Sequence, residues 1–230
     1  MKQLITVLFL VLFTSCTSKK QLPKSKDDRE WNRFELEGIV KTLKEKTYKA
    51  DFDNEKYEES KLRLLKSKIV MFDSIGRYTK ITSYDENNSI SGSTIASYVQ
   101  GKNYESVYYS KDNVFKNKNR IKYLSNKLIL EESFSYKEEL LFSIRVEKQN
   151  DRFSKVTLVN GDKIDSHFYY YTDDKFINNK VAINKNKDTI SNIKYKYLVF
   201  DKNGNWTKRL SKNSFNKNDI GKLEVREISY

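Results

Sequence analysis

The sequence predicts an all-β protein, in which an antiparallel meander of short strands curls into an open barrel or half-shell. Apolar and polar residues alternate with a period of two in several runs, which is typical of half-buried strands. The chain contains 16 Tyr and 13 Phe, and these residues favour pleated surfaces. Aromatic positions such as Phe72, Tyr84 and Tyr98 are 12 and 14 residues apart, with turn-forming residues between them. This spacing suits short antiparallel strands, and curling limits the exposed sheet edges.

The first residues are predicted to be a targeting signal. A short basic start precedes an apolar run at residues 4–13, which is too short to span a bilayer and is typical of a signal peptide. The run ends in Phe13-Thr14-Ser15-Cys16, which resembles the lipobox of bacterial lipoproteins. The resemblance implies cleavage before Cys16 and acylation of that cysteine. The alternative is an ordinary signal peptide in which the cysteine falls there by chance.

The lipobox resemblance sets the expected organisation and location. We expect a signal peptide at residues 1–15, the acylated cysteine and a flexible tether at 16–31, and a single all-β domain at 32–230. Acyl chains give stable membrane attachment, so the expected location is the bacterial cell envelope, anchored by lipid to the outer membrane. Ser25-Lys26-Asp27-Asp28 resembles the acidic export signal of Bacteroidetes surface lipoproteins. The cell surface and the periplasmic leaflet both stay open as orientations.

The first half of the body contains three predicted strands. Residues 38–43 are rich in Ile, Val and Thr and are expected to be extended, whereas the charged residues 51–60 are expected to form a loop. Residues 62–72 alternate between two faces, and one of these faces carries Lys66, Lys68, Val70 and Phe72. A turn follows in which Gly76 is free to adopt positive φ. Residues 78–84 form the next strand.

The second half is expected to continue the meander. Further strands are predicted at 95–100, 104–109, 121–123, 128–130, 142–146, 156–158, 164–171, 181–183, 193–200, 206–210 and 223–230. Asn160-Gly161 and Asn203-Gly204 are the clearest turn signals, because a type I′ hairpin turn requires positive φ at both central positions.

Two segments resemble YD-type (Rhs-like) repeats, whose pattern is Gly-Arg/Asn followed by six residues and Tyr-Asp. The segment from Gly76-Arg77 to Tyr84-Asp85 fits this pattern, and Asp201-Lys202-Asn203-Gly204-Asn205-Trp206 matches the same signature. The layout resembles that of small Bacteroidetes lipoproteins carrying such repeats. The resemblance implies an extended antiparallel sheet and supports the fold better than the function.

Candidate catalytic groups are few. The chain has one His and one Cys, which excludes His-cluster and Cys–His zinc sites, and we expect neither a metal nor a cofactor. His167 is expected to be an ordinary strand residue, with a general base as the alternative. Asp162 with Asp165, and Asp173 with Asp174, could serve glycoside hydrolysis, but aspartates are common in turns.

The aromatic residues are the more informative candidates. Tyr side chains on an exposed sheet face could stack against sugars or anchor a protein partner, and cross-strand pairing within the sheet is the alternative. The candidate contacts are Tyr169, Tyr170, Tyr171, Tyr195, Tyr197 and Trp206. Asp73-Ser74-Ile75 and Asp188-Thr189-Ile190 resemble the Bacteroidetes O-glycosylation sequon, which implies modification at Ser74 and Thr189.

We therefore expect an envelope-anchored, monomeric, non-catalytic binding protein whose partner is a glycan or another protein. An envelope glycan hydrolase that uses turn carboxylates is one alternative, and an immunity-type protein that binds a toxin is the other. The formal charge of +13 could attract a polyanion, but Lys and Asn are scattered along the whole chain. A nucleic-acid partner is not expected, because the predicted location lies outside the cytoplasm.

Overall fold

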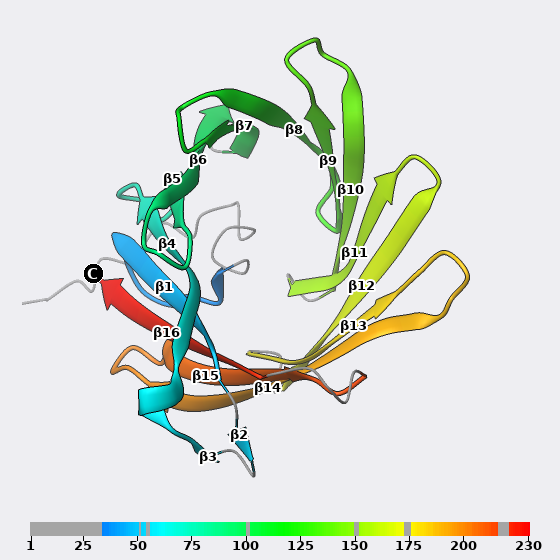
Figure 1. The fold of residues 1–230 in the computed structure, drawn as a ribbon. Coiled ribbons are helices and arrows are strands. Elements are labelled where there is room, and N and C mark those ends of the chain that lie inside the picture. Colours follow the sequence, from blue (N-terminus) through cyan, green and yellow to red (C-terminus); the bar gives the residue numbers. More distant parts are fainter. Residues whose placement is uncertain are drawn as a thin grey trace, which may run out of the picture.

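The computed structural model describes residues 34–50, 52–53, 56–99, 102–149, 152–172, 176–215 and 221–230. The predicted signal peptide, Cys16, the tether, Asp173 and Asp174 lie outside these residues. Fourteen strands of the described chain form a closed barrel in which neighbouring strands are antiparallel (Figure 1). The predicted all-β meander is therefore confirmed.

The strands have the following bounds. Those of the barrel are β1 (Thr42–Lys49), β4 (Arg63–Phe72), β5 (Tyr78–Tyr84), β6 (Ile90–Val99), β7 (Lys102–Ser110), β8 (Phe115–Ser125), β9 (Leu128–Phe134), β10 (Leu140–Gln149), β11 (Arg152–Asn160), β12 (Lys163–Thr172), β13 (Phe176–Ile183), β14 (Thr189–Phe200), β15 (Trp206–Asn213) and β16 (Lys222–Ser229). The connection from β1 to β4 holds a two-stranded sheet of β2 (Phe52–Asp53) and β3 (Lys56–Tyr57), followed by a 3₁₀ helix at Glu59–Lys61.

β1 closes the barrel. Consecutive strands of the barrel pair with one another, and β1 pairs in addition with the last strand, β16. Leu43 lies opposite Val70 on one side and opposite Ile228 on the other. The prediction of an open barrel or half-shell was thus wrong on this point. Closure pairs the backbone groups that two free edges would have left exposed.

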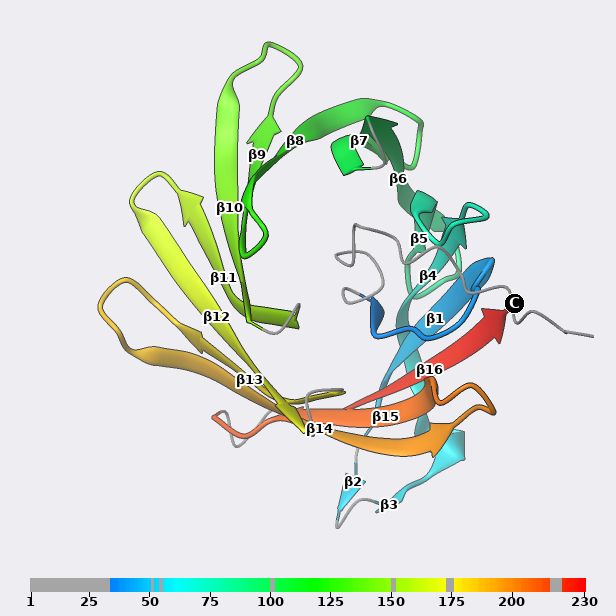
Figure 2. The ribbon, with the colours of Figure 1, turned by 180° about the vertical axis from the view of Figure 1, so that it is seen from behind.

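β1 also begins later than the sequence suggested. The predicted strand at residues 38–43 belongs to β1 only from Thr42 onward, and the backbone of Lys41 bonds to Ser229 and Phe72. Glu35 and Gly38 adopt φ values of 51° and 82°, which bend the chain before it can pair. This segment lies within the ring of strands rather than in its wall (Figures 1 and 2).

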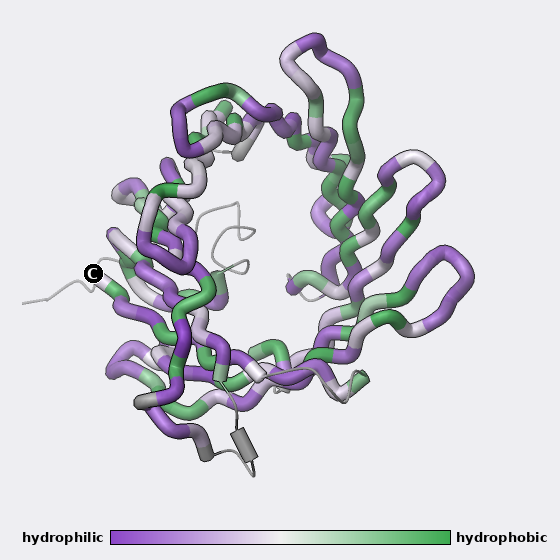
Figure 3. The backbone as a smooth tube through the Cα atoms, in the orientation of Figure 1, coloured by the Kyte–Doolittle hydropathy of each residue, from purple (hydrophilic) through white to green (hydrophobic). Residues whose placement is uncertain are grey.

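The register defines an inner and an outer face. Leu43, Val70 and Ile81 lie opposite one another across β1, β4 and β5, and they pack with Phe34 of the internal segment. They are therefore on the inner face. Because side chains alternate along a strand, Lys66 and Lys68 share that face with Val70, as the sequence predicted. Hydrophilic and hydrophobic residues alternate along much of the wall (Figure 3).

Six hairpins share one turn geometry. In each, the first residue's N–H donates to the carbonyl of the fifth, and the fourth residue's N–H donates back to the first. The fourth residue has positive φ, and in five of the six turns the first residue's side chain accepts backbone N–H groups within the turn. The turns span 73–77, 85–89, 110–114, 135–139, 184–188 and 201–205. The predicted Gly76 and Gly204 turns are two of them, although Asn203 does not have the positive φ that a type I′ turn would require.

Apolar packing occurs in separate clusters rather than in one core. One cluster surrounds Phe34 inside the barrel, and a second consists of Ile121, Ile129 and Val146 on β8, β9 and β10. A third, around Leu210 and Leu223, lies on the outer face beneath the β2–β3 connection, which projects from the barrel in Figure 2. Among the described residues, no helix has the length and hydrophobicity needed to cross a membrane.

Candidate binding site

Glu35 is the centre of a buried polar cluster. Its Oε2 accepts hydrogen bonds from Trp206 Nε1 at 2.9 Å and from Arg209 Nη1 at 2.7 Å. Its Oε1 lies 3.0 Å from the Tyr197 hydroxyl and accepts the Ile177 N–H at 3.1 Å. We call Glu35, Tyr197, Trp206 and Arg209 the Glu35 cage. The cage fixes the segment before β1 to strands β13, β14 and β15.

A second buried carboxylate lies beside the cage. Glu45 on β1 accepts hydrogen bonds from Arg226 Nε at 2.9 Å, and the Lys68 ammonium lies 2.7 Å from its other oxygen. The guanidinium groups of Arg226 and Arg209 lie 3.5 and 4.1 Å from the centre of the Trp206 ring. Trp206 is fully buried, so these cation–π contacts are shielded from water and are stronger than cation–π contacts at exposed sites.

The buried carboxylates are held in their ionised form. Burial alone would raise the pKa of Glu35, but the charges of Arg209 and Arg226 outweigh it, so the pKa lies below its usual value. Burial likewise opposes ionisation of Glu45, and Arg226 with Lys68 lowers its pKa strongly. Carboxylates with such low pKa values do not carry a proton near neutral pH and cannot act there as general acids.

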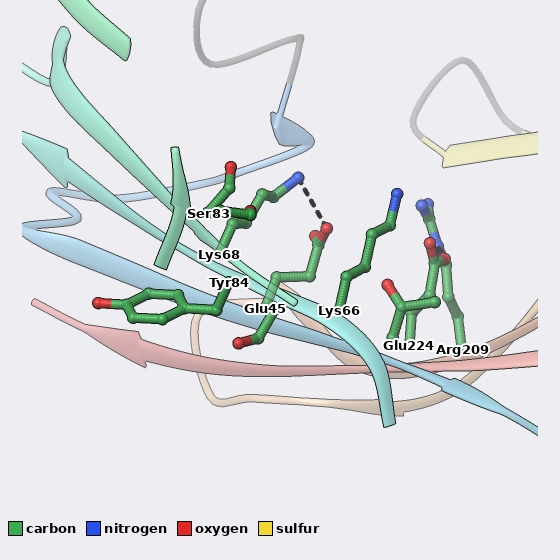
Figure 4. Close-up of a pocket in the computed structure, with 10 residues that line it drawn as sticks. Glu45, Lys66, Lys68, Ser83, Tyr84, Arg209 and Glu224 are labelled. Atoms are coloured by element: carbon green, nitrogen blue, oxygen red, sulfur yellow. Dashed lines mark hydrogen bonds and ion pairs between the residues drawn. The ribbon is translucent and has the colours of Figure 1, made fainter. Parts of the chain in front are cut away.

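A cavity of about 360 Å³ adjoins these ion pairs on the inner face (Figure 4). We call it the lysine pocket. Figure 4 shows Lys66, Lys68, Ser83 and Arg209 pointing to the same side of the sheet, and Tyr84 pointing away. The lining residues are Glu45, Thr47, Lys66, Ser67, Lys68, Ser83, Tyr84, Ser91, Arg209 and Glu224. The pocket combines charged groups with several hydroxyls, and sequence reasoning did not identify it.

A smaller pocket collects half of the predicted aromatic contacts. Tyr169, Tyr170 and Tyr171 at the end of β12 line a cavity of about 230 Å³, which we call the tyrosine pocket. Its other lining residues are Gln149, Arg152, Phe153 and Ser154. The Tyr171 hydroxyl donates to the Phe153 carbonyl at 3.0 Å, and this bond holds β12 against β11. Tyr170 is half exposed, at 50%.

The other three predicted contacts lie in the barrel interior. Tyr197 and Trp206 belong to the Glu35 cage, and Trp206 has no exposed surface. Tyr195 packs under the Arg209 guanidinium, 4.6 Å from ring centre to Cζ, and burial raises the pKa of its hydroxyl to about 12. Three of the six residues therefore line the tyrosine pocket, and the other three face the barrel interior.

Of the predicted catalytic candidates, Asp162 and Asp165 line one cavity of about 330 Å³, and His167 is not among its lining residues. His167 lies on β12 opposite Val156 and Ala182, and its Nδ1 has no hydrogen-bond partner in the structure. Burial lowers the pKa of His167, and the nearby charge of Lys180 lowers it further. Asp165 is buried beside Lys163, at 3.3 Å, whereas Asp162 is exposed in the turn. In the described part of the chain, no cluster of His, Cys, Asp and Glu could hold a metal ion.

The two predicted glycosylation residues lie at turns. Ser74 is exposed in the 73–77 turn, and Thr189 begins β14 directly after the 184–188 turn. Their modification stays a prediction.

The sequence matches no family model and no curated protein. Among solved structures, a porin-like protein from Bacteroides uniformis overlaps 83% of this chain and 96% of its own, with 10% identity and a TM-score of 0.48. A porin-like protein from Bacteroides vulgatus overlaps 80% and 97%, with 12% identity and a TM-score of 0.45. The function proposed for this chain rests on its own residues.

Proposed function

We propose that this protein is a non-catalytic, glycan-binding lipoprotein of the bacterial cell envelope, and that the tyrosine pocket holds the ligand. The observation that carries the proposal is that Tyr169, Tyr170 and Tyr171 line one cavity together with Arg152 and Gln149. Aromatic faces pack against the apolar faces of sugar rings, while guanidinium and amide groups bond to hydroxyls. In ligand pockets, polar groups placed among aromatic side chains fix the orientation of the ligand.

The chemistry of the pocket favours binding over hydrolysis. A glycosidase needs two carboxyl groups on either side of the scissile bond. The described residues that line the tyrosine pocket include no carboxylate. The buried carboxylates Glu35 and Glu45 are ion-paired in the barrel interior, where they serve the structure.

The outer face of the barrel supports attachment through Cys16 rather than through the wall. Cross-strand ion pairs lie on this face, such as Lys44 with Glu227 at 3.4 Å and Lys122 with Glu132 at 2.7 Å. A Lys or Arg facing lipid at the bilayer midplane costs about 2–4 kcal/mol. These ion pairs favour contact of this part of the face with water, and the acylated tether would then reach the membrane.

A glycan array probed with the full chain tests the proposal. We expect selective retention on a set of bacterial or host glycans, and at least about tenfold weaker binding by Tyr170→Ala and Arg152→Ala. Tyr104→Ala is the matched control, because Tyr104 is 51% exposed on β7, outside the pocket, and should bind as the wild type does. Equal losses in Tyr170→Ala and Tyr104→Ala, or no retention of any glycan, would refute the assignment.

A further inference from the structure

One cation of the lysine pocket has no carboxylate partner among the residues that the structure describes. Lys68 pairs with Glu45, and Arg209 pairs with Glu35 and Glu224. Arg226 pairs with Glu45. Lys66 lines the same pocket, and no carboxylate of the described chain lies within ion-pair distance of its ammonium group.

The charge balance around the pocket is therefore positive. Among the described residues, the cations are Lys66, Lys68, Arg209 and Arg226 and the carboxylates are Glu35, Glu45 and Glu224, so four positive charges face three negative ones. A charge in a partly enclosed site is screened less than one on an open surface, so the excess acts strongly on a ligand.

The residues that line the pocket also favour a ligand of negative charge. Glu45 and Glu224 already bind guanidinium groups, so they offer little to an incoming cation. The hydroxyls of Thr47, Ser83 and Ser91 are available to donate hydrogen bonds beside the Lys66 ammonium. Carboxylate and phosphate oxygens accept such bonds, and those from charged donors are the strongest.

We propose that the lysine pocket binds a small organic anion, whose carboxylate or phosphate group contacts Lys66 and the neighbouring hydroxyls. The volume of about 360 Å³ is at the lower end of the range for small-molecule sites, about 300–1,000 Å³. This site is lined by residues of β1, β4, β5, β6, β15 and β16 and shares no lining residue with the tyrosine pocket at β10, β11 and β12. The two sites can therefore be tested independently.

Calorimetric titration of the full chain tests the proposal with two sets of probes. Inorganic phosphate and glycerol phosphate report on phosphate recognition, and acetate and glucuronate report on carboxylate recognition. We expect saturable binding of at least one set. Lys66→Met should weaken that binding by about tenfold or more, which corresponds to one lost charge-assisted hydrogen bond. Which set binds identifies the anionic group.

The control is Lys80→Met. Lys80 lies on the adjacent strand β5 and is exposed, opposite Met71 and therefore on the outer face. The substitution changes the net charge equally and should alter the affinity less than about twofold. Lys66 makes no ion pair within the described chain, so Lys66→Met should keep the thermal stability of the wild type. Absence of saturable binding by any of the four probes, or equal binding by wild type and Lys66→Met, would overturn the proposal.

Discussion

Substitution of Glu35 by Gln should destabilise the barrel more than any surface charge substitution. The Glu35 side chain is 4% exposed and accepts hydrogen bonds from Trp206, Arg209 and the Ile177 N–H. The glutamine amide keeps the shape of the side chain but removes its charge. Its NH2 group replaces one carboxylate oxygen, so a hydrogen-bond donor then faces other donors. Arg209 then loses one of its two carboxylate partners and keeps Glu224.

The expected loss follows from the burial of this ion pair. Removing one partner of a buried pair costs about 3–5 kcal/mol, and we expect about 3 kcal/mol because Glu224 still neutralises Arg209. Urea unfolding, followed by far-ultraviolet circular dichroism, measures the change. With a slope of about 2–3 kcal/mol per molar urea, the midpoint should fall by about 1 M.

Glu58→Gln is the control for this experiment. Glu58 pairs with Lys61 at 2.9 Å, but both side chains are about two-thirds exposed. An exposed pair contributes about 0.5 kcal/mol or less. If Glu35→Gln moves the midpoint no further than Glu58→Gln does, the cage does not hold the segment before β1 in the barrel.

Four further predictions concern the pH dependence of stability, one glycine and one turn. Glu35 and Glu45 should contribute their full stabilisation above about pH 4.5, and this contribution should be lost as the pH falls through their lowered pKa values. Urea midpoints between pH 7 and pH 3 would measure the loss. The pKa of His167 is also lowered, so a smaller loss of stability should begin below pH 6.5 and be absent in His167→Gln. Equal pH profiles of the urea midpoint for the wild type and His167→Gln would contradict this. Gly92→Ala should lower the free energy of unfolding by about 1–3 kcal/mol, because the added Cβ would lie 2.6 Å from the Tyr109 carbonyl oxygen. A change below about 0.5 kcal/mol would show that β6 and β7 can move apart to make room for the methyl group. Asp201→Ala should cost about 1 kcal/mol in the same assay, since the Asp201 carboxylate accepts the N–H groups of residues 203 and 205, and an unchanged midpoint would mean that the backbone bonds alone hold the turn.

Local features of the fold were predictable because each depends on nearby residues. Alternation placed Lys66 and Lys68 on one face of β4, and the glycines at 76 and 204 marked two of the six shared turns. The other four were harder to recognise, because Asn88, Asn113, Glu138 and Lys187 occupy the positive-φ position. The signal that could have found them is an Asp, Ser or Asn three residues earlier, with an apolar residue just before it.

Barrel closure and the Glu35 cage were not predictable from local pattern. β1 pairs with β16 through residues about 180 positions away, such as Glu45 with Arg226. The contacts of Glu35 with Ile177, Trp206 and Arg209 span 142 to 174 positions. A single glutamate between Phe34 and Leu36 carries no sign of such partners. The same long separations concealed the lysine pocket, which is formed by strands from both ends of the chain.

The most direct test of the proposed function is photo-crosslinking in intact cells that express the full chain with Cys16 in place. A photoreactive phenylalanine at position 170 would report what occupies the tyrosine pocket, and the same group at position 104 would serve as the reference. We predict glycan-bearing material attached at position 170 and absent at position 104. Attachment of a single stoichiometric protein at position 170 would contradict glycan binding and identify a protein-interaction module instead. Identical products at both positions would contradict any role for the pocket.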